Sequence, residues 1–295
     1  MGRLDGRVAI VTGASRGIGK GIATHFAAEG AAVAVVARTE AQWDARMPGT
    51  IHETVAEIES DGGTALAVPA DLAHPDDVET VVARAAAAFG PVDILVNNAA
   101  LTIPGRPPSD QAAARADPGV ASGPTRASLP AGGTRMSFLT FPLKGFRLHL
   151  EIGLFATYRL MQLVLPGMID AGRGGIVNIS SLAGFIPGEG PYADAGTPGP
   201  IAYGGNKAAI HHLTESVAKE MQPHGIAINA LSPSEPVITP GNLVAAAGET
   251  DWASPEEFAE ATLLVALADP AVTNGQLLWS DDVLHPERGR RGWLR

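Results

Sequence analysis

Short apolar runs rich in Val, Ile and Ala alternate along this chain with longer Ala-rich segments of helical period. The runs are apolar at nearly every position, which is typical of strands buried on both faces of a parallel sheet. We expect strands at residues 8–11, 32–37, 65–69, 92–96, 176–179 and 226–230, and an edge strand at 277–279. Between them the period predicts helices at 18–29, 50–60, 75–89, 155–170 and 204–221.

This alternation predicts an α/β fold: a doubly wound parallel sheet with helices on both faces, the Rossmann arrangement. No linker interrupts it, so we expect residues 1–295 to form a single domain. Two stretches break the rhythm. Residues 101–142 hold seven prolines and five glycines, and residues 184–200 hold nine glycines or prolines. Such long irregular segments are either functional loops or disordered insertions, and we expect both beside the substrate.

Composition narrows the class of protein. Glycine and proline make up 35 and 23 of the 295 residues, but a hydrophobic fraction of 45% excludes a disordered polymer. The absence of cysteine excludes disulfides, Fe–S clusters, thiolate zinc sites and a cysteine nucleophile. A net charge of −10 disfavours nucleic acid or anionic lipid as the main partner. With no targeting or membrane-spanning segment visible, we expect a cytoplasmic protein, and no His and carboxylate spacing assembles a metal site.

A glycine-rich turn follows the first predicted strand and opens the first helix. Gly13 allows the tight turn, Gly17 lets the backbone approach a pyrophosphate, and Gly19 lets the helix pack on the strand. The sequence therefore predicts a dinucleotide-binding turn. The cofactor-binding residues expected there are Gly13, Ser15, Arg16, Gly17, Ile18 and Gly19.

The choice of cofactor is expected at the end of the second strand. An NAD site requires an acidic side chain there for the ribose 2′-hydroxyl, whereas this chain has Arg38 and Thr39. Guanidinium groups are natural partners of a phosphate, so Arg38 and Arg16 favour NADP(H). Two alternatives stay open: both arginines are solvated surface residues, or Glu40 serves a ribose.

Six short motifs follow one another in order: Thr12–Gly19, Asp71-Leu72, Asn97–Ala100, Asn178–Ser181, Tyr203–Lys207 and Asn229–Pro233. Together they resemble the short-chain dehydrogenase/reductase family. The resemblance implies a homodimer or homotetramer formed through the helices at 155–170 and 204–221. It also implies further cofactor contacts, with Lys207 beside the nicotinamide ribose, at Asp71, Leu72, Asn98, Ala99, Ala100, Tyr203, Lys207, Pro233 and Ser234.

The chemistry can be argued from the residues themselves. Tyr203 and Lys207 are four residues apart on a predicted helix, so they share a face. A phenol with a pKa near ~10 is a poor acid–base group at neutral pH. A neighbouring ammonium, together with the positive ring of an oxidised nicotinamide, favours the phenolate and would bring this pKa toward ~7. Ser181 would hydrogen-bond the same substrate oxygen, so the predicted catalytic residues are Ser181, Tyr203 and Lys207.

Several departures from the family pattern concern the same region. Gly153 stands where the family usually has an asparagine that supports a proton relay, largely through its backbone carbonyl. Ser181 and Tyr203 are 22 residues apart, a longer spacing than is usual. Ser234 replaces the usual glycine after Pro233, and Ala100 replaces another. His211 and His212 are adjacent on the helix, so we expect them at a surface or an interface.

The sequence thus predicts an NADP(H)-dependent oxidoreductase that interconverts a carbonyl and a secondary alcohol, with Tyr203 as general acid and base. A second hypothesis within enzymes is an enoyl-type reductase on the same scaffold. A third, from another class, is an NADP(H)-binding protein with little catalysis, suggested by Gly153 and the irregular segment 101–142. The substrate, the physiological direction and the oligomeric state stay undetermined at this stage.

Overall fold

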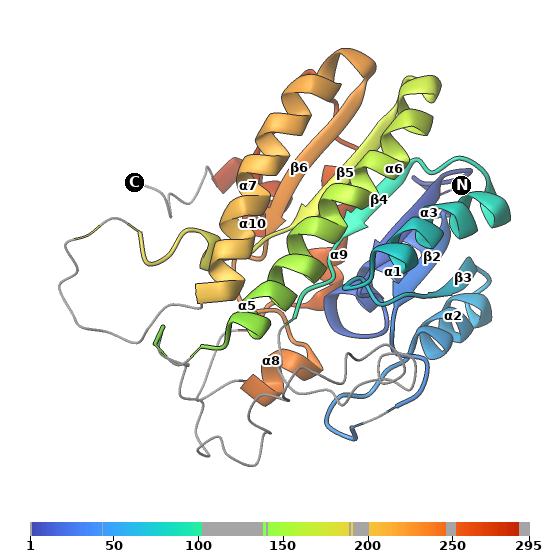
Figure 1. The fold of residues 1–295 in the computed structure, drawn as a ribbon. Helices are drawn as coiled ribbons and strands as arrows, with labels where there is room; N and C mark the ends of the chain where they lie inside the picture. The colour runs from blue at the N-terminus through green and yellow to red at the C-terminus, as the bar shows by residue number, and fades with distance from the viewer. Residues whose placement is uncertain are drawn as a thin grey trace.

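The computed structural model describes residues 2–42, 44–101, 138–139, 141–188, 190, 201–245 and 252–288. Within them lies a parallel sheet in the order β3-β2-β1-β4-β5-β6-β7 (Figure 1). The strands are β1 (Val8–Thr12), β2 (Ala32–Ala37), β3 (Thr64–Pro69), β4 (Ile94–Asn97), β5 (Gly174–Ile179), β6 (Ile226–Ser232) and β7 (Leu277–Trp279). The strand order reverses between β1 and β4, and a crevice for ligands forms at the carboxyl ends of such strands. The predicted doubly wound α/β fold is therefore confirmed.

The strands are apolar at most positions because helices cover both faces of the sheet. Every residue of β1 is buried, and successive side chains enter opposite layers. Ala9 and Val11 join one core cluster, and Val8 and Ile10 join the other. The first cluster is built with α1 (Gly17–Ala28), α2 (Ile51–Ser60) and α9 (Pro255–Ala266). The second is built with α3 (Pro75–Phe89), α6 (Ala156–Ala171) and α7 (Ile201–Met221).

The remaining helical segments are shorter. They are α5 (Leu143–Leu150), the π-helical η2 (Glu151–Phe155), η3 (Leu182–Gly184), η4 (Gln222–His224), α8 (Pro240–Ala245), α10 (Ser280–Leu284) and η5 (Pro286–Arg288). In Figure 1, α5 continues through η2 into α6 as one long helix. The predicted helix at 155–170 therefore begins twelve residues earlier, at Leu143. Pro142 precedes this start in an extended conformation, which Pro favours just outside a helix.

The twelve-residue helix α9 was not predicted although its sequence carries a clear start signal, and the shorter helices α8 and α10 were not predicted either. Ser254 caps α9 by accepting hydrogen bonds from the backbone N–H groups of Glu256 and Glu257. Pro255 occupies the first helical position, and the two glutamates lie in the first turn, where the helix dipole favours them. The two irregular segments expected at 101–142 and 184–200 fall largely outside the described residues.

One long helix has the length and apolar composition that a membrane span would need. In the described part of the chain, the helix Leu143–Ala171 is long and apolar enough to cross a bilayer, with a mean hydropathy of 1.4 in its most apolar window. The core helices of soluble proteins pass the same test, so this composition is weak evidence for a span. In this fold the helix packs on α3, β4 and β5 and contributes Leu160 and Val164 to the core.

Candidate functional site

The turn between β1 and α1 forms a backbone cradle. Gly13 and Gly17 have φ angles of +68° and +55°, in the left-handed region that favours glycine. A Cβ on Gly19 would lie 2.4 Å from the carbonyl oxygen of Gly13 and 2.5 Å from Nδ2 of Asn98. No side chain fits there without displacing a neighbour, and the turn opens α1, whose N-terminus attracts anions. These features fit the phosphates of a dinucleotide.

The loop after β4 is tied directly to this turn. Thr12 Oγ1 accepts hydrogen bonds from the backbone N–H groups of Asn98 and Ala99, each 3.0 Å long. The side-chain amide of Asn98 donates to the carbonyl oxygen of Thr12 over 2.8 Å. The structure therefore places Asn98 and Ala99 beside the glycine turn, and Ala100 continues the same loop. Ser15 is buried within the turn, while the side chain of Ile18 packs against the core.

The residues predicted around the adenine end also come together. Arg38 Nη1 lies 3.4 Å from the Oδ2 atom of Asp71, although 33 positions separate them in the sequence. Leu72, the next residue, is 8% exposed and belongs to the core cluster under β2 and β3. Thr39 is buried, and its carbonyl oxygen accepts a hydrogen bond from the backbone N–H of Ile51.

The second arginine approaches this region from the glycine turn. Arg16 donates from Nη2 to the carbonyl oxygen of Gly49 over 2.7 Å. Glu40, the acidic alternative for a ribose contact, lies 3.4 Å from Nε2 of His52. The guanidinium groups of Arg38 and Arg16 and the carboxylate of Asp71 thus lie near the end of β2, whereas the carboxylate of Glu40 is directed to a histidine.

The three residues predicted to carry the chemistry lie close together, between the carboxyl end of β5 and the start of α7. Ser181 follows β5, and its side chain forms a hydrogen bond with Tyr203. Lys207 is 3% exposed and donates from Nζ to the carbonyl oxygen of Ile179 over 2.6 Å. The same Nζ atom lies 5.5 Å from the centre of the Tyr203 ring. The i, i+4 spacing on α7 therefore places the ammonium beside the phenol, as expected.

Burial changes the pKa values of this pair. Burial raises the pKa of Tyr203 above its ordinary value, and the hydrogen bond with Ser181 opposes that rise. Burial also lowers the pKa of Lys207 to about 8. The expected depression of the phenol pKa is therefore not a property of the protein chain by itself. A further positive charge, such as an oxidised nicotinamide ring, would be needed to bring it down.

The expectation that His211 lies at a surface or an interface is wrong. His211 is 7% exposed and shares a hydrogen bond with Ser180, the residue before Ser181. Its ring lies 4.4 Å from the ring of Phe185, centre to centre. Burial, with a smaller contribution from the charge of Lys207, lowers the pKa of His211 to about 4. His212 is exposed as predicted, because adjacent helical residues point in different directions.

Two further residues near Tyr203 were not predicted. The ring of His149, on α5, lies 6.4 Å from the ring of Tyr203. Asn206, on α7, is 1% exposed and lies directly against Gly153 of η2. The position of Asn206 inside the Tyr203–Lys207 motif was the only sequence signal for it.

The loop after β6 completes the same edge of the sheet. Ser234 donates from its backbone N–H to Ser280 Oγ over 3.0 Å, and its own Oγ accepts from the backbone N–H of Asp281 over 2.9 Å. Pro233 and Ser234 are thereby tied to the end of β7. The serine that replaces the usual glycine is used for these contacts within the protein.

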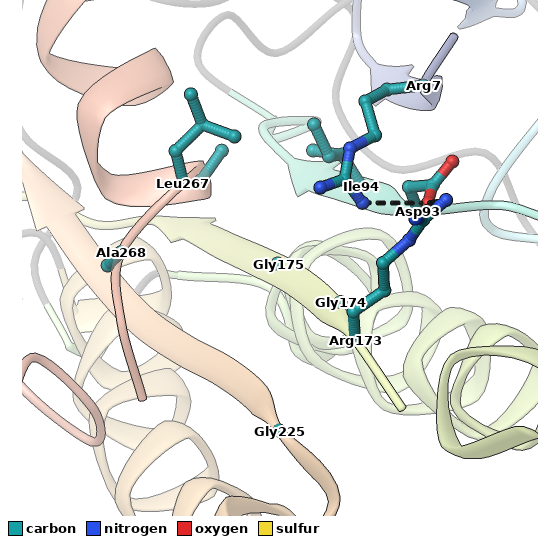
Figure 2. Close-up of a pocket in the computed structure, with 10 residues that line it drawn as sticks. Arg7, Asp93, Ile94, Arg173, Gly174, Gly175, Gly225, Leu267 and Ala268 are labelled. Atoms are coloured by element: carbon teal, nitrogen blue, oxygen red, sulfur yellow. Dashed lines mark hydrogen bonds and ion pairs between the residues drawn. The ribbon is translucent and has the colours of Figure 1, made fainter. Parts of the chain in front are cut away.

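The opposite edge of the sheet holds a different polar cluster. Figure 2 shows a hollow at the amino ends of the strands, where Arg7 and Arg173 both extend toward Asp93. Each guanidinium group lies 3.0 Å from the Oδ1 atom of Asp93. None of the predicted site residues lines this hollow. Over the described ranges, no group of three or more His, Asp and Glu residues is arranged to hold a metal ion.

This chain is similar to known proteins in both sequence and fold. L-rhamnose 1-dehydrogenase (NAD(P)(+)) of Sphingomonas sp. is 30% identical over 283 residues, which cover 95% of this chain and 90% of that protein. A short chain dehydrogenase from Burkholderia cenocepacia, solved in complex with NADP, has a TM-score of 0.70 at 26% identity, covering 94% of this chain and 97% of that one. A 7α-hydroxysteroid dehydrogenase complexed with NADH and 7-oxo glycochenodeoxycholic acid has a TM-score of 0.69 at 29% identity, with 94% and 93% covered.

The family profile described as short chain dehydrogenase matches residues 7–117 and 130–242, which include the glycine turn and the Tyr203–Lys207 motif. These matches agree with the parallel sheet and with the residues gathered at its carboxyl edge. The chain belongs to the short-chain dehydrogenase/reductase family of oxidoreductases.

Proposed function

We propose that this protein is an NADP(H)-dependent oxidoreductase that interconverts a carbonyl and a secondary alcohol. The observation that carries the proposal is the contact between Ser181 and Tyr203, with the buried ammonium of Lys207 beside the phenol ring. A hydroxyl pair next to a buried cation suits a reacting oxygen that gains and loses a proton. The glycine turn lies at the same edge of the sheet, next to β1, so a dinucleotide there would extend toward this pair.

Each of the three proposed catalytic residues has a distinct role in this reaction. In the reducing direction Tyr203 donates its phenolic proton to the carbonyl oxygen as that oxygen becomes an alkoxide, and Ser181 donates a hydrogen bond to the same atom. In the oxidising direction the phenolate accepts the alcohol proton. The nicotinamide cofactor, when bound, supplies or accepts the hydride. The ammonium of Lys207 stabilises the phenolate, and a pKa of about 8 keeps Lys207 mostly charged at neutral pH.

The cofactor proposal rests on the charges near the end of β2. Arg38 and Arg16 would bind the 2′-phosphate, while Asp71 orients Arg38 and offsets part of its charge. Relatives carry either cofactor, since one similar structure holds NADP and another NADH. Turnover with each cofactor at matched concentrations tests the proposal. We expect an NADPH preference of about tenfold or more, as from one charge-assisted hydrogen bond, and equal or better use of NADH would contradict it.

A panel of ketones, aldehydes and secondary alcohols tests the function. We expect NADPH consumption with at least one carbonyl compound, and a loss of about a hundredfold or more in Tyr203→Phe because the proton donor is removed. Tyr158→Phe is the matched control, since Tyr158 lies on the exposed side of α6, and it should keep its activity. NADPH binding without consumption across the panel would support the binding-protein hypothesis, and reduction of only C=C bonds would support the enoyl-type reductase.

Three further features complete the proposal. Residues 1–295 act as a single domain, the protein works in the cytoplasm, and it assembles into a homodimer or homotetramer. Support for assembly comes from α6, where the side chains of Phe155, at its N-terminal boundary, and Tyr158 are 52% and 48% exposed. Apolar side chains of this size lose contact with water when two such helices pack together.

A further inference from the structure

Asn206 and Gly153 fit together across two helices. An ideal Cβ on Gly153 would lie 1.9 Å from Nδ2 of Asn206, 2.7 Å from its Cγ and 2.8 Å from its Oδ1. These distances are too short for any real contact, so the amide of Asn206 occupies the space that a side chain at position 153 would need. The glycine on η2 and the asparagine on α7 therefore depend on each other.

The amide of Asn206 is buried in a place where its oxygen lacks a hydrogen-bond donor. Asn206 is 1% exposed, and its Oδ1 atom has no hydrogen-bond partner among the described residues. A buried amide oxygen without a donor costs free energy, so such a group usually serves a purpose beyond packing. A hydrophobic or smaller residue would fill the space at lower cost.

The surroundings of this amide indicate the purpose. On α7, Asn206 and Lys207 come three and four residues after Tyr203, so each of them is a neighbour of Tyr203 on the helix surface. Gly153 lies at the middle of η2, a five-residue π-helical segment, and such segments are frequent at functional sites. The ammonium of Lys207 has three protons, of which one is donated to the carbonyl oxygen of Ile179.

We propose that Asn206 is a positioning residue of the proposed oxidoreductase: its Oδ1 atom, seated against Gly153, is the acceptor for a water that in turn accepts a hydrogen bond from the ammonium of Lys207. The acceptor favours the charged ammonium, and the charged ammonium favours the phenolate of Tyr203. Gly153 is required because only glycine leaves room for the amide. This inference rests on the proposed function for its catalytic consequence, but the packing of the pair does not.

Three variants test separately whether the amide group is needed and whether its position is needed. Asn206→Ser removes the amide. Gly153→Ala keeps the amide but pushes it aside, with Gly167→Ala on the same long helix as the matched control, because a Cβ on Gly167 meets nothing within 4 Å. The double variant Gly153→Asn with Asn206→Ser moves the amide from α7 to η2.

The first readout is kcat as a function of pH for alcohol oxidation. We expect Asn206→Ser and Gly153→Ala each to lower kcat by about tenfold or more, the effect of one hydrogen bond to a charged group. The acidic limb of the profile should move to higher pH, since the phenolate loses support. The double variant should recover most of kcat and the original profile, and Gly167→Ala should match the wild type.

A wild-type pH profile in Asn206→Ser would overturn the proposal, as would a double variant that is no better than Asn206→Ser. An equal loss at every pH would show that Asn206 is only structural.

Thermal unfolding without any substrate provides a second readout. Gly153→Ala should melt below Gly167→Ala, and adding Asn206→Ser should relieve that loss. If Asn206→Ser restores the melting temperature of Gly153→Ala in a protein with no turnover, the proposed function has failed but the packing of Asn206 against Gly153 is supported. If Asn206→Ser does not restore it, the packing of the two residues is refuted.

Discussion

The contacts of His211 illustrate how much a single residue on α7 depends on its environment. Tyr203, Lys207 and His211 are spaced four residues apart, so all three lie on the side of α7 that faces the sheet. His211 shares a hydrogen bond with Ser180 and packs on Phe185 and Gly184, which connects α7 to the segment after β5. A neutral imidazole is held there because burial and the nearby ammonium both disfavour a second positive charge.

The neutral His211 makes stability depend on pH. Its pKa falls from 6.5 in the unfolded chain to about 4 in the folded protein. Below pH 6.5 the unfolded chain therefore binds a proton that the folded protein does not, and stability is lost as the pH falls toward 4. At pH 5 this loss is on the order of 2 kcal/mol.

His211→Gln should remove this contribution, because glutamine keeps a hydrogen-bonding side chain but does not titrate. We expect the difference in melting temperature between pH 7.5 and pH 5, with carboxylates contributing equally in both proteins, to be smaller in the variant than in the wild type. His212→Gln is the matched control, since His212 is exposed. Identical pH dependence in His211→Gln and the wild type would show that the imidazole is not held neutral.

At the scale of elements, Asp93 connects three strands at their amino ends. It precedes β4, accepts a hydrogen bond from the backbone N–H of Val8 at the start of β1, and contacts Arg173 just before β5. Arg7 provides a second guanidinium contact (Figure 2). Asp93 is 8% exposed, so these donors compensate its burial. This cluster holds the central strands together at the edge opposite the site.

Asp93→Asn should destabilise the fold without changing the chemistry. An amide cannot accept from all these donors, and removing one partner from a mostly buried ion pair costs about 2 to 3 kcal/mol when the arginines remain partly hydrated. Urea unfolding should show this as a lower midpoint with an unchanged slope. Asp170→Asn on the exposed end of α6 should leave the midpoint unchanged. A loss of turnover in folded Asp93→Asn would mean that the two edges of the sheet are coupled.

At the scale of the whole molecule, one long helix exposes several large apolar side chains. Along the continuous helix of α5, η2 and α6, Leu143, Phe155 and Tyr158 are 62%, 52% and 48% exposed. The same helix carries His149 and Gly153 on its inner side, near the candidate site. A partner packed on this helix would therefore stabilise the wall of the site as well as bury apolar surface.

Phe155→Glu should lower the mass of the assembly. A carboxylate at the centre of an apolar contact between two copies carries an uncompensated desolvation cost. Light scattering coupled to size-exclusion chromatography should show a multimer for the wild type and a smaller species for the variant. Ala87→Glu, at an exposed position of α3, is the control and should keep the wild-type mass. A monomeric wild-type protein would refute the proposed assembly.

Much of this protein was predictable from local pattern. The uniformly apolar strands, the glycine turn and the spacing of Tyr203 and Lys207 each express a rule that acts over a few residues. The start of α9 also has a local signal in the sequence, a serine cap at Ser254 followed by Pro255 at the first helical position. The beginning of α5 at Leu143 was less readable, because it follows a long segment rich in glycine and proline.

The sequence by itself determined the order of the strands, the family and the motifs that lie at the carboxyl edge of the sheet, since each depends on short-range periodicity or on a short motif. Only the tertiary structure decided the burial of His211, the pKa of Lys207 and the fit of Asn206 against Gly153. Asn206 and Gly153 are 53 positions apart, and Ser180 and His211 are 31 apart. Contacts between residues so distant in the chain form only when the sheet and helices have packed, because burial is a property of the packed neighbours and not of the residue.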